Sequence, residues 1–221
     1  MEKVPVRTPN RTPFIVIDGM DGSGKGTQID LLVDRAIRSG RKFYNTREPG
    51  GAVLSEEIRA LFSSPEGASA SARTQFLLMW AARSNWLEKI VIPNLSASTP
   101  IISDRGDSST LAYQVYAKEA PQLEDEFWRM RSMIFGEYTP TLYIFVDVPA
   151  REAKRRVDLD NSRTKSAFDA QPLEWYERVR HGFEAFQNEL PNHVLMINGD
   201  RPTEVIHEEI YKIVSEHCGW K

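Results

Sequence analysis

The sequence predicts an α/β fold, in which a parallel sheet of five strands carries helices on both faces. Short apolar runs alternate with segments of helical spacing along the chain, which is the order of a doubly wound sheet with right-handed crossovers. The run Leu142–Val148 is the most continuous apolar stretch and predicts a strand buried on both faces. The first apolar run, Phe14–Ile17, ends at a glycine-rich turn, as a strand that leads into a loop would.

The chain has 221 residues, which suits one domain with a sizeable core. We expect residues 13–221 to form this domain. Residues 1–12 are rich in Pro, Thr and Arg and show no periodic pattern, so we expect a flexible lead-in.

The elements follow one another at regular intervals. After the turn, apolar residues at helical spacing predict a first helix that ends at Ser39-Gly40. The other apolar periods predict helices over residues 54–62, 74–95, 109–120, 123–135, 149–157, 173–190 and 202–217. Short apolar runs predict further strands over residues 42–46, 100–103, 142–148 and 193–198. Polar residues predict a loop over residues 63–71 and a mobile lid over residues 158–171.

The turn after the first strand carries the spacing of a phosphate-binding loop. Gly19, Gly24 and Lys25 fit G-x-x-x-x-G-K, in which backbone N–H groups and a helix start face a polyphosphate. Glycine permits positive-φ turns and close approach of the backbone to oxygen. The residue after the lysine is Gly26 rather than Ser or Thr, and the hydroxyl comes one place later, at Thr27. The alternative is an ordinary strand-turn-helix with a glycine-rich connection.

Two further strands end in charged residues. Arg47-Glu48 precedes Pro49 and two glycines, and Asp104-Arg105 follows the run at 100–103. Open α/β sheets bind ligands at the carboxyl ends of their strands, so these residues are candidates for a ligand site.

Composition excludes several classes. Hydrophobic residues make up 41% and charged residues 27%, as in an ordinary globular protein. The net charge is -3 without a basic block, which argues against a nucleic-acid partner. No apolar run is long enough to span a bilayer and the N-terminus lacks a signal-peptide core, so we expect a cytoplasmic protein without a membrane partner. The single cysteine, Cys218, and the four histidines show no metal-ligand spacing.

Four motifs in the same order resemble thymidylate kinases of the bacterial kind. They are the phosphate loop, TREPGG at 46–51, AAR at 81–83 and DRGDSSTLAYQ at 104–114. The loop is shared by many nucleotide-binding proteins, whereas the other three motifs are much narrower. The resemblance implies transfer of the γ-phosphoryl group of ATP to dTMP with Mg²⁺. It also implies a homodimer, for which the long helix carrying Trp80 and Trp86 is a candidate interface.

The resemblance also assigns roles to individual residues. The catalytic candidates are Lys25, Arg105, Arg163 and Asp21. The candidates for holding the ATP phosphates are Gly22, Ser23, Gly24, Lys25, Gly26 and Thr27. The candidates for binding dTMP are Asp21, Glu48, Pro49, Arg59, Met79, Arg83, Arg105, Ser109, Thr110, Tyr113 and Gln114. Thr27 and Asp104 resemble the residues near magnesium, acting directly or through water.

Within the dTMP set, the resemblance places Arg83 and Gln114 on the thymine, with Ser109 and Thr110 beside it, and Arg105 on the phosphate. Family members with glycine at the place of Gly22 bring a catalytic arginine from the lid, which points to Arg163, with Lys165 as a second candidate.

Four residues depart from the family pattern: Gly26, Gly106, Met79 and Ala167. Met79 stands where a phenylalanine stacks on thymine, and a thioether defines a base plane less sharply than a ring. The alternatives are therefore a kinase of another nucleoside monophosphate, and a nucleotide-binding protein or hydrolase without an acceptor.

Overall fold

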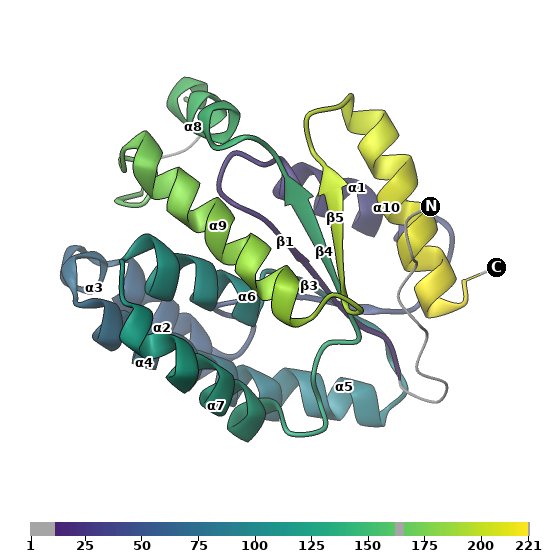
Figure 1. The fold of residues 1–221 in the computed structure, drawn as a ribbon. Coiled ribbons are helices and arrows are strands. Elements are labelled where there is room, and N and C mark those ends of the chain that lie inside the picture. The colour runs from purple at the N-terminus through teal and green to yellow at the C-terminus, as the bar shows by residue number, and fades with distance from the viewer. Residues whose placement is uncertain (1–11, 162–165, 221) are drawn as a thin grey trace.

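The computed structural model describes residues 12–161 and 166–220. Within these residues it contains one sheet of five parallel strands, in the order β2-β3-β1-β4-β5 (Figure 1). The strands are β1 (Phe14–Asp18), β2 (Tyr44–Arg47), β3 (Ile101–Asp104), β4 (Leu142–Asp147) and β5 (Val194–Asn198). The predicted α/β fold is confirmed, whereas the predicted lead-in lies almost wholly outside the described residues.

The register brings the charged strand ends together. Ile17 of β1 is the partner of Asp104 of β3, and Arg47 of β2 is a partner of the same residue. The backbone N–H of Arg105 donates to the carbonyl of Ile17 over 2.9 Å. The loop after β1 and the Asp-Arg pair after β3 therefore lie at the same edge of the sheet.

Ten α-helices are described. They are α1 (Lys25–Arg38), α2 (Val53–Ser63), α3 (Pro65–Ser69), α4 (Ala72–Trp86), α5 (Ile92–Ser96), α6 (Asp107–Thr110), α7 (Glu124–Phe135), α8 (Ala150–Leu159), α9 (Leu173–Glu189) and α10 (Thr203–Cys218). The π-helical segments η1 (Leu87–Val91) and η2 (Leu111–Ala117) continue α4 and α6, and η3 (Pro121–Leu123) is a short 3-10 turn.

The predicted loop over residues 63–71 is wrong in part, because it contains α3. The Ser64 side chain caps this helix by accepting a hydrogen bond from the Gly67 N–H over 3.1 Å, and Pro65 starts it. Both are ordinary start signals, hidden in a stretch of small polar residues.

Alternate residues of β1 pack on opposite faces of the sheet, as the period of a strand requires. Ile15 and Ile17 face the apolar residues of α1 and α10. Phe14 and Val16 face a larger cluster drawn from α4, η2, α7, α8 and α9. Both faces are therefore covered by helices.

Trp80 and Trp86 of α4 are buried in the larger cluster. Their indole groups cannot form an interface between two chains, because the core of a single chain already covers them. An interface on this helix would use its exposed residues, such as Leu77.

The segment predicted as a lid, residues 158–171, is described in part. Asp158 and Leu159 complete α8, and residues 162–165 lie outside the described residues. The part from Ser166 to Gln171 is anchored, since the buried carboxylate of Asp169 accepts hydrogen bonds from the N–H and hydroxyl of Ser166 at 2.7 and 2.8 Å. Within the described residues, no helix is both long and apolar enough to cross a membrane.

Candidate active site

The loop between β1 and α1 has the backbone that its glycines predict. Gly19, Gly22 and Gly24 all have positive φ, and Lys25 begins α1. A Cβ at Gly19 would lie 2.5 Å from the carbonyl oxygen of Val146. The backbone N–H groups at the start of α1 have no partner within the helix and carry its positive dipole end, so this loop suits an anion.

Lys25 is buried beneath the loop, with Nζ 3.6 Å from a carboxylate oxygen of Asp21. Burial, followed by the nearby charge of Arg105, lowers the pKa of Lys25. An anion bound at the loop would add negative charge next to this ammonium group and stabilise its charged form.

Steric contacts explain why residue 22 is a glycine. A Cβ there would lie 2.3 Å from the carbonyl oxygen of Ala153 and 3.0 Å from a methyl group of Val157. Both residues belong to α8, which therefore packs directly on the phosphate loop. A side chain at this position would require α8 to move.

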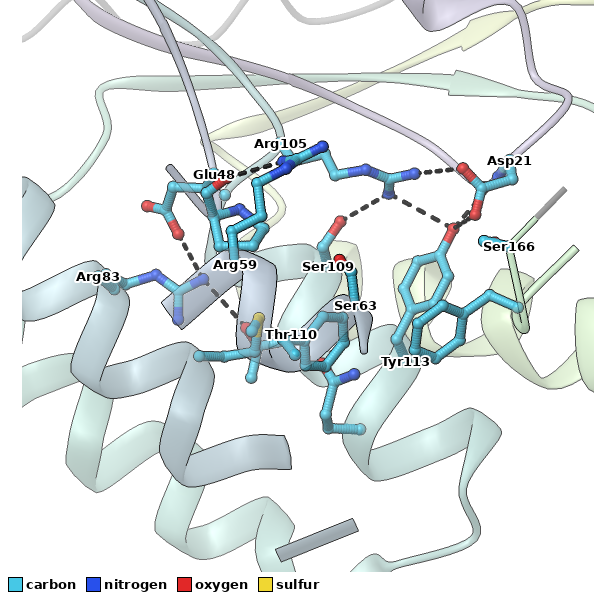
Figure 2. Close-up of a pocket in the computed structure, with 16 residues that line it drawn as sticks. Asp21, Glu48, Arg59, Ser63, Arg83, Arg105, Ser109, Thr110, Tyr113 and Ser166 are labelled. Atoms are coloured by element: carbon cyan, nitrogen blue, oxygen red, sulfur yellow. Dashed lines mark hydrogen bonds and ion pairs between the residues drawn. The ribbon is translucent and has the colours of Figure 1, made fainter. Parts of the chain in front are cut away.

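Beside the loop lies a cavity of about 250 Å³. All eleven residues proposed for the acceptor line it, although they come from six separate parts of the chain. Five further residues complete the lining: Phe62, Ser63, Gly106, Ser166 and Phe168. The polar groups of the cavity gather at two ends, one around Arg83 and the other around Arg105 and Asp21 (Figure 2).

Arg83 and Glu48 form a buried ion pair at one end, with 2.6 Å between the guanidinium and a carboxylate oxygen. The same nitrogen of Arg83 donates to the hydroxyl of Thr110 over 3.0 Å. Among the described residues, Arg83 Nε and Nη1 and Glu48 Oε1 are buried without a hydrogen-bond partner. Burial raises the pKa of Glu48 to about 7, against the opposing effect of Arg83. Unpaired buried donors and acceptors are costly, so this end suits a polar ligand edge.

Arg105 dominates the other end (Figure 2). Its guanidinium donates to a carboxylate oxygen of Asp21 over 2.5 Å and to the hydroxyl of Ser109 over 3.0 Å. The hydroxyl of Tyr113 donates to the second oxygen of Asp21 over 3.0 Å. Arg105 has a φ of 67°, a left-handed conformation that is rare in a residue with a side chain and is often found at functional sites.

Ser109 lies at the Arg105 end rather than beside Arg83. Its hydroxyl donates to the carboxylate of Asp18, which also accepts from the hydroxyl of Ser108 over 2.6 Å. Asp18 is fully buried, and this burial raises its pKa. Thr110, by contrast, contacts Arg83, and the position of both residues beside a base stays a prediction.

Sequence reasoning missed the aromatic wall formed by Phe62 and Phe168. Phe62 ends an ordinary helical period, and Phe168 is the only aromatic residue in the polar segment 158–171. Its position among polar residues could have indicated a tertiary contact, because a large aromatic side chain is stabilised by packing against other apolar groups. Met79 and Gly106 also line the cavity. A Cβ at Gly106 would meet a methyl group of Val16 at 2.9 Å, so the missing side chain does not enlarge the cavity.

A second cavity of about 270 Å³ lies on the other side of the phosphate loop. Its lining residues are Ser23, Gly24, Thr27, Gln28, Arg156, Gly199, Arg201, Thr203 and Ile206. The loop therefore separates two cavities, and Thr27 belongs to this second one. None of the residues after Thr27 in this set was predicted. Most of them come from α8, the β5–α10 connection and α10, which are far from the loop in sequence.

The proposed metal residues partly fit a magnesium ion. One carboxylate oxygen of Asp104 is buried without a hydrogen-bond partner among the described residues. This oxygen is therefore available to bind a cation or a water molecule. Thr27 is exposed in the first turn of α1. No group of three or more His, Cys, Asp or Glu side chains with metal-binding spacing occurs in the described residues. Mg²⁺ normally takes one or two carboxylates and completes its shell with water and substrate phosphate. Arg163 and Lys165 lie outside the described residues.

Fold and site together place the chain among the P-loop nucleotide kinases, because residues of one phosphate loop line two cavities, and Asp21 of that loop pairs with both Lys25 and Arg105. A family model described as "Thymidylate kinase" matches residues 17–210. The chain belongs to the thymidylate kinase family.

Curated and solved relatives agree with this assignment. The chain is 32% identical to a thymidylate kinase of Bacillus cytotoxicus, over 91% of this chain and 96% of the relative. It is 34% identical to one of Chlamydia caviae, over 92% of this chain and 96% of the relative. The crystal structure of the thymidylate kinase of Ehrlichia chaffeensis matches with a TM-score of 0.71 at 26% identity, covering 92% of this chain and 98% of the other.

Proposed function

We propose that this protein transfers the γ-phosphoryl group of ATP to dTMP, giving ADP and dTDP. The observation that carries the proposal is the cavity beside the phosphate loop, which has an arginine at each end and two phenylalanines in its lining (Figure 2). A nucleoside monophosphate has the matching features, since a polar base edge and a phosphate lie at opposite ends of a less polar sugar. Family membership supports the reaction.

In this proposal the donor lies on the loop and in the second cavity. Lys25 and the N–H groups of the loop bind the β- and γ-phosphates, with Gly22, Ser23, Gly24, Gly26 and Thr27 forming the rest of the cradle. The nucleoside of ATP occupies the cavity between the loop and the β5–α10 connection. Arg156 and Arg201 line that cavity and suit contact with a flat base through their planar guanidinium groups.

The acceptor lies with its phosphate at Arg105 and its base at Arg83. Arg83 and Gln114 read the thymine edge, for which the unpaired nitrogens of Arg83 are available. Arg59 donates to the carbonyl of Pro49 over 2.8 Å, which holds its guanidinium at the edge of the cavity, near the acceptor phosphate in our proposal. Tyr113 packs beside the sugar.

The transfer needs no nucleophilic side chain. An oxygen of the dTMP phosphate attacks the γ-phosphorus, the bond to the β–γ bridging oxygen breaks, and ADP leaves with the electron pair. Such a loose transition state requires positioning and charge neutralisation. Lys25 neutralises the donor and Arg105 the acceptor, and the carboxylate of Asp21 pairs with both cations. Arg163 remains our proposed additional cation on the transferring group.

Magnesium, when bound with ATP, would neutralise phosphate charge and fix the donor geometry. We propose that Asp104 and Thr27 hold it, directly or through water. The partnerless oxygen of Asp104 supports this role.

We also propose a cytoplasmic homodimer. ATP and dTMP are cytoplasmic metabolites, which supports the location. Apolar side chains remain exposed on α2 and α4, namely Val53, Leu54, Leu61 and Leu77, and such residues suit a contact with a second copy. Sedimentation equilibrium would test this, and a monomer at micromolar concentration would contradict it.

A coupled ADP-release assay with dTMP, dUMP, dGMP, dCMP and AMP tests the function. We expect release to depend on an acceptor and to be most efficient with dTMP. Greater efficiency with dGMP, dCMP or AMP would reassign the acceptor. Release without any acceptor would indicate a hydrolase, and no release would indicate a silent nucleotide-binding protein.

A further inference from the structure

The apolar wall of the acceptor cavity is built by two stacked rings. Phe62 lies in the last turn of α2, and Phe168 lies in the segment before α9. Their ring centroids are 5.4 Å apart and their planes differ by only 12°. Both rings line the cavity, so the stack connects α2 to the segment before α9 across one side of it.

Phe168 is held from behind by rings of two other elements. Tyr113 of η2 contacts it edge-on at 6.4 Å between centroids, and Trp175 of α9 lies at 6.1 Å. The next residue, Asp169, is buried and bonded to Ser166, and its carbonyl accepts from the hydroxyl of Tyr176 over 3.3 Å. The ring is therefore positioned by the fold itself.

The same contacts connect the stack to the phosphate end of the cavity. Tyr113 packs against Phe168 with its ring, and its hydroxyl donates to Asp21. The Arg105 guanidinium also lies over the Tyr113 ring, 5.2 Å from its centroid. Thus the apolar wall and the proposed phosphate-binding arginine share one support.

We propose that Phe62 and Phe168 form an aromatic clasp that packs against the nucleoside of the acceptor and supplies the rigid apolar surface that Met79 does not. Met79 is buried at the same cavity, but its side chain is unbranched and flexible. Two rings held at a fixed distance define a flat surface at little entropic cost. This inference rests on the proposed function.

Steady-state kinetics with wild type, F168A, F168L, F62A and F62A/F168A test the clasp. We expect F168A to raise the KM for dTMP about 10-fold or more, with kcat changed less and the KM for ATP within about 2-fold. F168L keeps apolar bulk but loses the flat ring, and it should still raise the KM for dTMP several-fold. The KM for dTMP of the double variant should be no higher than that of the weaker-binding single variant, because removing either ring already breaks the stack.

The matched control is F43A. Phe43 also pairs with another ring, that of Trp220 at 5.8 Å, but it packs in the cluster with α1 and α10 and does not line the acceptor cavity. It should leave the KM for dTMP unchanged. Thermal melts of all variants identify any that fail to fold, and F168L replaces F168A as the decisive variant in that case.

The outcomes separate the two proposals. If wild type turns over dTMP and both F168A and F168L keep its KM, the clasp is wrong and the proposed function stands. If wild type shows no dTMP-dependent ADP release, the proposed function is wrong and the clasp falls with it. An equal rise in the KM for ATP and dTMP would also overturn the clasp, because it would reveal a general structural defect.

Discussion

The guanidinium of Arg83 lies 2.6 Å from the carboxylate of Glu48, and both side chains are buried at the inner end of the acceptor cavity. The pair joins α4 to the loop after β2, and it leaves two nitrogens of Arg83 and one oxygen of Glu48 without partners among the described residues. A buried ion pair whose hydrogen-bonding capacity is incomplete is costly. The polar edge of a bound base would supply the missing hydrogen bonds and offset that cost. The ion pair is therefore suited to base recognition.

The raised pKa of Glu48 predicts a pH-dependent stability. Its folded-state pKa is about 7 against an ordinary 4.5, so the folded protein favours the protonated form. Its contribution to the free energy of unfolding is complete below pH 4.5 and is lost as the pH rises through 7. Between pH 5.5 and 8.5, wild type should lose about 2 kcal/mol that E48Q does not lose. Denaturant unfolding of both proteins at the two pH values measures this, and parallel changes would show that Glu48 does not titrate in this range.

Arg105→Ala should raise the KM for dTMP and lower kcat. The side chain can neutralise the acceptor phosphate in both the ground state and the transition state, and charge-assisted hydrogen bonds contribute about 1.5–3 kcal/mol each. We expect kcat/KM to fall by about 100-fold or more, measured by ADP release. Arg129→Ala is the control, because Arg129 is an exposed arginine of α7 paired only with Glu126 in the described structure. A loss of kcat/KM of similar size in the control would contradict a specific role of Arg105 in binding the acceptor phosphate.

Gly22→Ala should destabilise the protein more than Gly24→Ala. Both glycines have positive φ, so both substitutions carry a backbone cost of about 1–2 kcal/mol. Only at Gly22 would the new Cβ meet α8, whereas at Gly24 nothing lies within 4 Å. Overpacking adds about 1–3 kcal/mol. Thermal or denaturant unfolding without nucleotide measures the difference, and equal stabilities of the two variants would mean that α8 is free to move away.

Gly26→Ser should improve binding of Mg·ATP. No atom lies within 4 Å of a Cβ at this position, so the fold accepts a side chain there. The new hydroxyl would follow the lysine, where P-loops commonly bind magnesium, and serine favours a helix over glycine by about 0.5 kcal/mol. Calorimetric titration with ATP in the presence and absence of Mg²⁺ should show a gain only with the metal. A gain without Mg²⁺ would assign the effect to the helix alone.

The sequence by itself determined the elements and the residues that serve the cavity. Five apolar runs separated by helical periods specified a parallel sheet, because strand and helix spacing are local properties of the chain. Charged residues placed at the ends of those runs specified a site at the carboxyl edge. The eleven acceptor candidates, which the resemblance to thymidylate kinases assigned, all line one cavity.

Only the tertiary structure decided how those residues divide the cavity between them. Ser109 lies with Asp18 and Arg105 rather than with Arg83, and Trp80 and Trp86 are enclosed in the core of one chain. Gly22 is required by the carbonyl of Ala153, which is 131 positions away, and Phe168 meets Phe62 across 106 positions. Such contacts depend on which helices pack together. Local spacing carries no information about them, since a turn or a period reports only on its nearest neighbours in the chain.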